Sequence, residues 1–301
     1  MEHITPAVDT FNISSSPLPS VDWTSGALVP AIMLSLCFLL GVPGNMAVIL
    51  LRSKWQHLSS LSQSLMLNLA VSDLICLITL PLWIYDFLYS WIFSLVACKI
   101  ISYLVYCSIY NSLLTVTSLS VQRCLQVVYL QRSLGQRGQR RLLVLLWLVA
   151  MILSTHALVF NQIIAYQQGS HCRGQYFSDS QQVAVLLTES LVGFVSLFVV
   201  TFSYIRIHIT VHKTSFFNNP RTTRLTTSII VTFFVLWLPF HIVNVLGVAA
   251  LSLKDKGLLK IFSDSTNFVS ALTFVNSCLN PLLYAFATCN TCTVCQNSNQ
   301  E

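Results

Sequence analysis

Long apolar stretches alternate with short polar ones along almost the whole chain. Seven stretches are long enough to cross a bilayer as helices, which takes about 20 mainly apolar residues. They run near Leu28–Leu51, Ser62–Phe87, Val96–Val128, Leu142–Gln162, Val183–Thr210, Thr222–Leu251 and Leu258–Ala287. The pattern predicts an all-α membrane protein: a seven-transmembrane helix bundle over residues 28–287, an N-terminal tail of residues 1–27 and a short cysteine-containing tail of residues 288–301.

Composition supports a membrane domain. Of the 301 residues, 54% are hydrophobic and 9% are charged, whereas soluble domains carry about 25% charged residues. A water-soluble fold of this length could not bury so much apolar surface. The net charge of +6 is expected of a protein that faces anionic membrane lipids, so it implies no nucleic-acid partner.

The basic residues predict the orientation. With the N-terminus extracellular, 11 of the 16 Lys and Arg residues fall on the cytoplasmic side, as the positive-inside rule requires. The first 27 residues lack the features of a signal peptide, so the first span is expected to direct its own insertion. We therefore predict a multi-pass plasma-membrane protein with a cytoplasmic C-terminus.

Several side chains are candidates for covalent modification. Cys98 and Cys172 are both predicted on the outer side, where a disulfide can persist. Asn12 begins an Asn-Ile-Ser glycosylation sequon. Three cysteines follow the last span and are candidates for palmitoylation, with inert thiols as the equal alternative; these are Cys289, Cys292 and Cys295.

Polar residues at membrane depth are costly and suggest function. Asp73 lies in the middle of the second span, and amide and hydroxyl groups are predicted at similar depth: Asn45, Asn68, Asn111, Ser112, Asn276 and Asn280. One carboxylate among such oxygens suits a small cation. The alternative is a hydrogen-bonded network that only joins helices.

A second polar group is predicted nearer the outer face, and a third at the inner face. The outer group, in which residues three or four apart share a helix face, describes a ligand site. It comprises Tyr106, Tyr110, Glu189, His241 and Asn244, with Arg173 at its mouth. At the inner face, Arg123, Tyr204 and Tyr284 suggest a conformational switch, and Pro239 is expected to kink the sixth span.

The motifs together resemble those of the rhodopsin-like (class A) G-protein-coupled receptors. In chain order the matching motifs are Gly44-Asn45, Asn68-Leu69-Ala70-Val71-Ser72-Asp73, Trp91-Ile92-Phe93, Cys98, Trp147, Tyr204, Phe233 to Pro239, and Asn280-Pro281-Leu282-Leu283-Tyr284. Each motif is weak alone, but their order is specific.

The resemblance implies roles for these residues. An allosteric sodium ion would bind near Asp73, with Asn45, Ser112, Asn276 and Asn280. Phe233 and Trp237 would couple ligand binding to movement of the sixth helix. Arg123, Tyr204 and Tyr284 would open a cleft for a heterotrimeric G protein, expected to be of the inhibitory class. Cys98 and Cys172 would form the outer disulfide.

Three departures from the family pattern stand out. The usual Asp-Arg-Tyr reads Gln122-Arg123-Cys124, so the acid that restrains the arginine is missing and basal signalling is expected to be raised. Ser196 replaces a proline of the fifth helix. The tail after the seventh helix lacks the basic-aromatic pattern of an eighth helix.

Two residues that other receptor classes carry are missing from this chain, which narrows the class of ligand. Val105 stands where amine receptors carry an aspartate, and residues 261–287 contain no lysine for a Schiff base. The chain is similar to the chemoattractant branch and, within it, most to the leukotriene B4 receptors, although Ser102 replaces their histidine. That similarity implies a hydroxylated fatty acid whose hydroxyls contact Tyr110, Glu189 and Asn244. Candidate partners for its carboxylate are Arg173, Lys99 and His241.

A peptide chemoattractant is the alternative ligand. An ion or proton transporter needs a chain of titratable groups across the bilayer, yet Asp73 and Glu189 are the acids that we place deep in the spans. An enzyme is not expected, because metalloprotease and Gly-x-Ser-x-Gly motifs are absent from the sequence.

Overall fold

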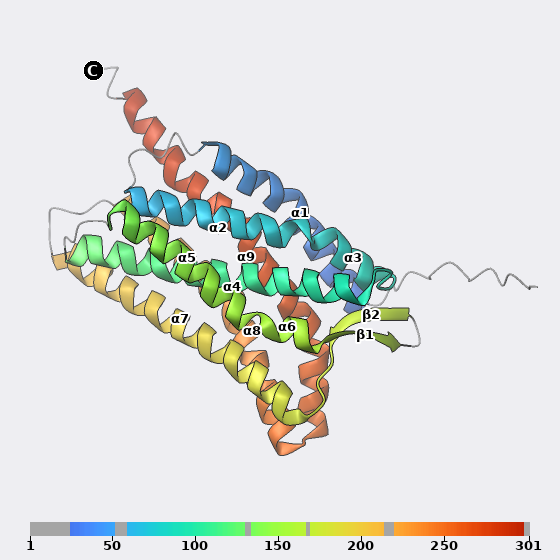
Figure 1. Ribbon diagram of the computed structural model, residues 1–301. Coiled ribbons are helices and arrows are strands. Elements are labelled where there is room, and N and C mark those ends of the chain that lie inside the picture. Colours follow the sequence, from blue (N-terminus) through green and yellow to red (C-terminus); the bar gives the residue numbers. More distant parts are fainter. Residues whose placement is uncertain (1–24, 52–58, 130–133, 167–168, 214–219, 298–301) are drawn as a thin grey trace, which may run out of the picture.

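The computed structural model describes residues 25–51, 59–129, 134–166, 169–213 and 220–297 (Figure 1). Nine helices and two strands follow one another in the described chain. They are α1 (Ser25–Leu50), α2 (Ser60–Ile78), α3 (Leu80–Leu88), α4 (Leu95–Val128), α5 (Gln136–Leu153), α6 (Thr155–Phe160), β1 (Asn161–Tyr166), β2 (Gly169–Gly174), α7 (Asp179–Lys213), α8 (Pro220–Leu253) and α9 (Lys256–Asn297). Helices α2 and α3 form one span, as do α5 and α6, so the prediction of a seven-helix bundle is confirmed.

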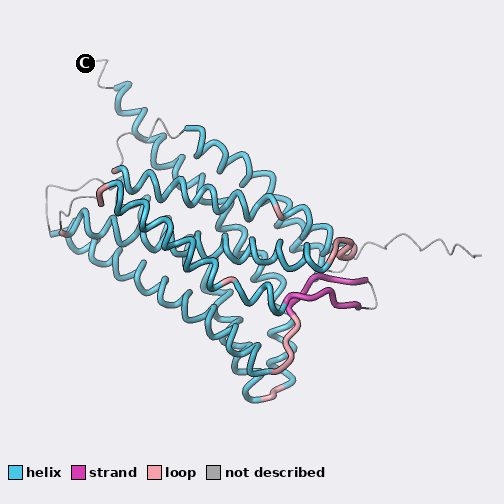
Figure 2. The backbone as a smooth tube through the Cα atoms, viewed as in Figure 1, coloured by secondary structure: helices cyan, strands magenta, loops and turns pink. Residues whose placement is uncertain are grey.

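Six segments of the described chain are individually long and apolar enough to cross a membrane. The seventh, α9, has a more polar start and packs against α1 and α8. Figure 2 shows the bundle as almost entirely helical, with one strand pair at one end. We call this the hairpin end; the last turns of α9 lie at the opposite end (Figure 1).

The fourth predicted span needs correction. It was expected to be one helix to Gln162, but the helix is interrupted at Ser154 and ends at Phe160. Gln162 belongs to β1 and pairs with Arg173 of the antiparallel strand β2. Strand pairing satisfies the main-chain groups that would otherwise be left unpaired beyond the helix end, which explains why an apolar sequence leaves the helical conformation here.

Helix α4 lies at the centre of the bundle and contacts α2, α5, α6, α7 and β1. Two glycines bring α1 close to α9: an added Cβ would lie 2.9 Å from Cys278 Cβ at Gly41, and 3.0 Å from Pro281 Cβ at Gly44. The Gly41 contact is closer than real side chains show and the Gly44 contact is tighter than most, and small residues commonly allow membrane helices to pack this tightly. The tight packing places α9 beside the polar residues of α2 and α4.

Candidate functional site

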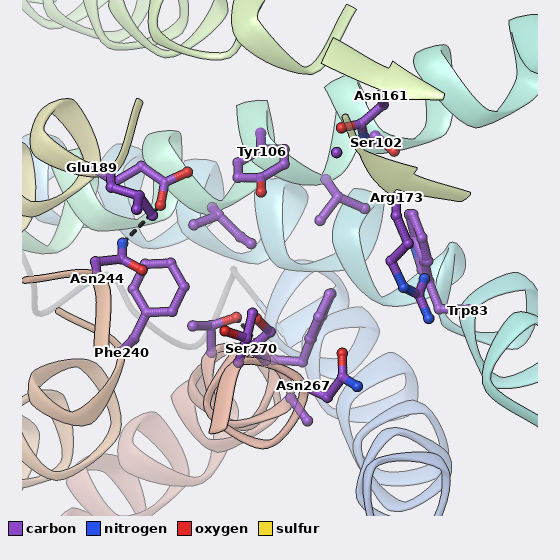
Figure 3. Close-up of a pocket in the computed structure, with 18 of the residues that line it drawn as sticks. Trp83, Ser102, Tyr106, Asn161, Arg173, Glu189, Phe240, Asn244, Asn267 and Ser270 are labelled. Carbon is purple, nitrogen blue, oxygen red and sulfur yellow. Dashed lines mark hydrogen bonds between the residues drawn. The ribbon is translucent and has the colours of Figure 1, made fainter. Parts of the chain in front are cut away.

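A cavity of about 500 Å³ opens at the hairpin end, between α4, α7, α8, α9 and β2 (Figure 3). Many of the side chains that line it are apolar, among them Val105, Ile109, Leu113, Phe240 and Phe274. The six residues predicted for a ligand site all line this cavity: Tyr106, Tyr110, Arg173, Glu189, His241 and Asn244. Lys99 is not among the lining residues. The fold thus brings together polar groups from four separate elements.

One end of the cavity carries a buried acid–amide pair. Asn244 Nδ2 on α8 donates to Glu189 Oε2 on α7 at 2.8 Å (Figure 3). Glu189 is 7% exposed and Asn244 is 4% exposed. The Tyr110 hydroxyl nearby is buried and finds no hydrogen-bond partner among the described residues. An unsatisfied buried group costs about 1–3 kcal/mol, so a ligand that bonds Tyr110 would regain that energy.

His241 lies beside this pair on α8. Its ring stacks on Trp237, with centroids 5.9 Å apart and planes 17° apart. Neither ring nitrogen hydrogen-bonds to a described residue, although the side chain is almost completely buried. Gly193 on α7 provides the space, because a Cβ there would overlap the imidazole ring. The cavity lining is therefore in direct contact with the tryptophan of the sixth-helix motif.

The other end of the cavity carries Arg173, which Figure 3 shows well separated from Glu189. Arg173 Nη1 donates to Asp86 Oδ2 of α3 at 2.6 Å and to the Cys172 carbonyl at 2.9 Å. His171 Nδ1 lies 3.3 Å from Asp86 Oδ1, and the Cys172 amide donates to the same oxygen at 3.4 Å. The Arg173 side chain is 29% exposed, so it remains accessible to a ligand.

The strand pair is held over the cavity in two ways. Cys98 of α4 and Cys172 of β2 form a disulfide, which confirms the predicted pair. Asp86 fixes the same strand to α3 through the contacts with Arg173 and His171. Next to β2, burial and then the negative charge of Glu189 raise the pKa of Tyr176, so this cavity-lining phenol is a neutral hydrogen-bond donor.

The predicted polar core forms around Asp73 of α2, which is fully buried. Ser112 Oγ donates to its Oδ1 at 2.9 Å, and Asn280 Nδ2 donates to its Oδ2 at 2.7 Å. Asn45 Nδ2 bonds the carbonyl of Ser277 at 3.0 Å. The amides of Asn68, Asn111 and Asn276 are also buried.

The chemistry of this core suits a small cation. Asp73 supplies a carboxylate and Ser112 a hydroxyl, and the Asn45 Oδ1 and Asn111 Oδ1 atoms are buried without hydrogen-bond partners among the described residues. Hard cations prefer such oxygen ligands. Both Asp73 oxygens also accept hydrogen bonds that join α2 to α4 and α9, so the core links helices in either case.

Residues 44–284 match the family described as "7 transmembrane receptor (rhodopsin family)". The chain belongs to this family. The human leukotriene B4 receptor 1 is 32% identical over 91% of this chain and 81% of its own length. Human C-C chemokine receptor type 8 is 28% identical over 91% and 80%, and mouse formyl peptide receptor-related sequence 1 is 28% identical over 91% and 82%.

These relatives place the chain in the chemoattractant and chemokine-like branch of the G-protein-coupled receptors. It is a multi-pass plasma-membrane receptor that signals through G proteins, and not an enzyme. The family membership also excludes an ion or proton transporter.

At the receptor end opposite the hairpin, Gln122 replaces the family's acid. Its Nε2 donates at 2.8 Å to Oγ of Ser59, the residue that caps the N-terminus of α2. Arg123 and Tyr204 lie on α4 and α7 and are half-buried, and the Tyr204 ring is 5.9 Å from that of His208. Gln122 is therefore hydrogen-bonded to the N-terminal cap of α2.

For some of the predicted site residues, the structure describes only the backbone or nothing at all. Asn12 lies outside the described residues. Phe233 lies on α8, and Tyr284 and the three tail cysteines lie on α9, but their side chains are not among those described. The backbone of α9 continues as a helix to Asn297, beyond the predicted end of the last span at Ala287.

Sequence reasoning overlooked two buried ionisable residues of the receptor. Asp86 is fully buried although it lies next to the end of the predicted second span, and it was not selected as a site residue. His156 lies in the fourth predicted span, with Nε2 3.7 Å from Glu189 Oε1. Ionisable residues inside spans are the general signal that identifies both.

Proposed function

We propose that this receptor binds a leukotriene B4-like hydroxylated fatty acid and activates a heterotrimeric G protein of the inhibitory class. The observation that carries the proposal is the character of the cavity: its lining combines many apolar side chains with a cation at one end, Arg173, and, well separated from it, the hydrogen-bonding groups of Glu189 and Asn244 (Figure 3). A fatty acid with hydroxyl groups has the same arrangement of charge, hydrocarbon and hydrogen-bonding groups.

The carboxylate is assigned to Arg173. Of the three candidates, Lys99 does not line the cavity, and His241 lies beside the acid at the other end. The bonds of Arg173 to Asp86 and Cys172 both use Nη1, and a guanidinium has five N–H donors in all. The same side chain therefore has donors for a second carboxylate.

The hydroxyls are assigned to the Glu189 end. A ligand hydroxyl can donate to the Glu189 carboxylate and accept from Tyr110, whose hydroxyl lacks a partner among the described residues. Sites that hydrogen-bond a ligand hydroxyl discriminate strongly against analogues that lack it, because the buried protein groups are then left unpaired. The human relative is named a leukotriene B4 receptor, which supports this ligand class.

Signalling is proposed to run from the cavity through Trp237, which stacks on His241. An agonist that binds the active state more tightly shifts the equilibrium towards it, with α8 moving relative to α7 and Arg123, Tyr204 and Tyr284 rearranging. We place the hairpin end outside the cell, as the basic residues predict, and an allosteric sodium ion near Asp73, Ser112, Asn276 and Asn280.

The test compares lipids with peptides. Cells expressing the receptor are exposed to leukotriene B4, to its 12-deoxy analogue and to a panel of chemokines and formyl peptides, and G-protein dissociation is recorded with and without pertussis toxin. We expect a saturable, toxin-sensitive response to leukotriene B4 and a weaker one to the deoxy compound. A saturable peptide response without a lipid response would overturn the ligand assignment and favour the peptide alternative.

A further inference from the structure

The junction between α5 and α6 fixes the tautomer of His156. Three successive side chains here, Ser154, Thr155 and His156, bond main-chain carbonyls of the preceding turn. His156 Nδ1 lies 2.9 Å from the Leu153 carbonyl oxygen. A carbonyl only accepts hydrogen bonds, so Nδ1 carries the hydrogen. In a neutral imidazole, Nε2 then presents a lone pair.

That lone pair faces a carboxylate. His156 Nε2 lies 3.7 Å from Glu189 Oε1, and the two side chains are only 13% and 8% exposed. The other carboxylate oxygen, Oε2, is bonded by Asn244. Within the described residues, no Lys or Arg nitrogen lies within 4.0 Å of Glu189. A neutral His156 beside an ionised Glu189 would therefore leave two acceptors facing each other and a buried charge uncompensated.

The His156 ring also packs against an aromatic side chain of α4. The Tyr106 ring of α4 meets it edge-on, with centroids 4.5 Å apart and planes 75° apart. Tyr106 and Tyr110 supply neutral phenols to this region and no positive charge. The imidazole of His156 is thus the group positioned to compensate the negative charge of the Glu189 carboxylate.

We propose that His156 and Glu189 together carry one proton, on Nε2 or on Oε1, and that this proton keeps the hydroxyl-binding wall of the cavity neutral. With the proton on Nε2 the two side chains form an ion pair across 3.7 Å, and with the proton on Oε1 both side chains are neutral, so the pair carries no net charge in either form. Because Glu189 has further lone pairs, it still accepts a ligand hydroxyl.

This inference rests on the proposed anionic ligand and removes an apparent conflict in it. A carboxylate on the wall of a cavity enclosed in low dielectric would repel a fatty acid, because charges interact strongly there. His156 is therefore a positioning residue that determines which ligand charge the receptor admits. Without it, the cavity would favour amines or cationic peptides over fatty acids.

The test is a double-mutant cycle on the full-length receptor, with His156→Phe, Glu189→Gln and the double variant. Phenylalanine keeps the packing against Tyr106 but cannot hold the proton, and glutamine removes the charge. We expect His156→Phe to weaken leukotriene B4 binding roughly 30-fold, as for the loss of one partner of a buried charge pair. Glu189→Gln should cost about 10-fold through the lost hydroxyl contact, and the double variant should be no worse than Glu189→Gln alone.

A second readout does not need the ligand. The thermal midpoint of the purified, ligand-free receptor should fall in His156→Phe and recover when Glu189→Gln is added. Leu158→Phe, a change on an exposed residue of the same helix, is the control and should leave both readouts unchanged. Additive effects of the two substitutions on the thermal midpoint would refute the proposal that His156 and Glu189 carry one proton together. A wild-type receptor that does not bind leukotriene B4 would refute the ligand assignment alone.

Discussion

The substitution Arg173→Gln tests whether Arg173 binds the carboxylate of the ligand. The guanidinium lines the cavity end opposite Glu189 and is itself bonded to the fully buried Asp86 at 2.6 Å. A charge-assisted hydrogen bond to a ligand carboxylate contributes about 2 kcal/mol, which corresponds to a roughly 30-fold loss of affinity when it is removed. The partial exposure of Arg173 places the effect at the lower end of the range for charged partners.

The same exchange has a structural cost. It leaves the Asp86 carboxylate buried with only the His171 ring and the Cys172 amide as described partners. Removing one member of a buried ion pair costs about 3 kcal/mol, so the surface level of the variant is expected to fall. Adding Asp86→Asn removes the stranded charge and should restore the surface level, without restoring affinity for the fatty acid.

The assay separates these effects with two ligands. Competition binding is measured with leukotriene B4 and with its methyl ester, on the wild type, on Arg173→Gln and on the double variant, at matched surface levels. Only the free acid should lose about 30-fold in affinity. An equal loss for acid and ester would refute the assignment of Arg173 to the carboxylate, and Arg173→Lys serves as the charge-conserving control.

Three further predictions concern the other polar groups. Asn244→Ala should reduce leukotriene B4 potency about 10-fold but leave the 12-deoxy analogue unaffected in dose–response curves, and an equal shift for both ligands would count against the hydroxyl assignment. Asp73→Asn should abolish the effect of sodium chloride, measured against choline chloride, on agonist affinity; a persisting sodium effect would exclude the polar core as its site. Gln122→Asp should lower basal guanine-nucleotide exchange several-fold by supplying a charge beside Arg123, with Gln122→Asn as the neutral control. Unchanged basal exchange in the aspartate variant would refute the idea that the missing acid raises signalling.

The sequence by itself determined the number of spans and the polar positions within them. Hydrocarbon has no water to satisfy main-chain groups, so an apolar stretch of sufficient length favours a helix, and all seven stretches are helical over most of their length. Buried polar groups are expensive in such an environment, which is why Tyr110, Glu189 and Asn244 could be selected without any coordinates.

The tertiary structure alone decided which polar groups meet. The Glu189–Asn244 bond joins residues 55 positions apart, and the Asp86–Arg173 bond joins residues 87 apart; no local periodicity encodes such pairings. The end of the fourth span depends on pairing between β1 and β2, and the position of His156 depends on a helix break that hydropathy does not register. Hydropathy reflects transfer between solvents, whereas the charge of a buried acid depends on the partners that the fold places beside it.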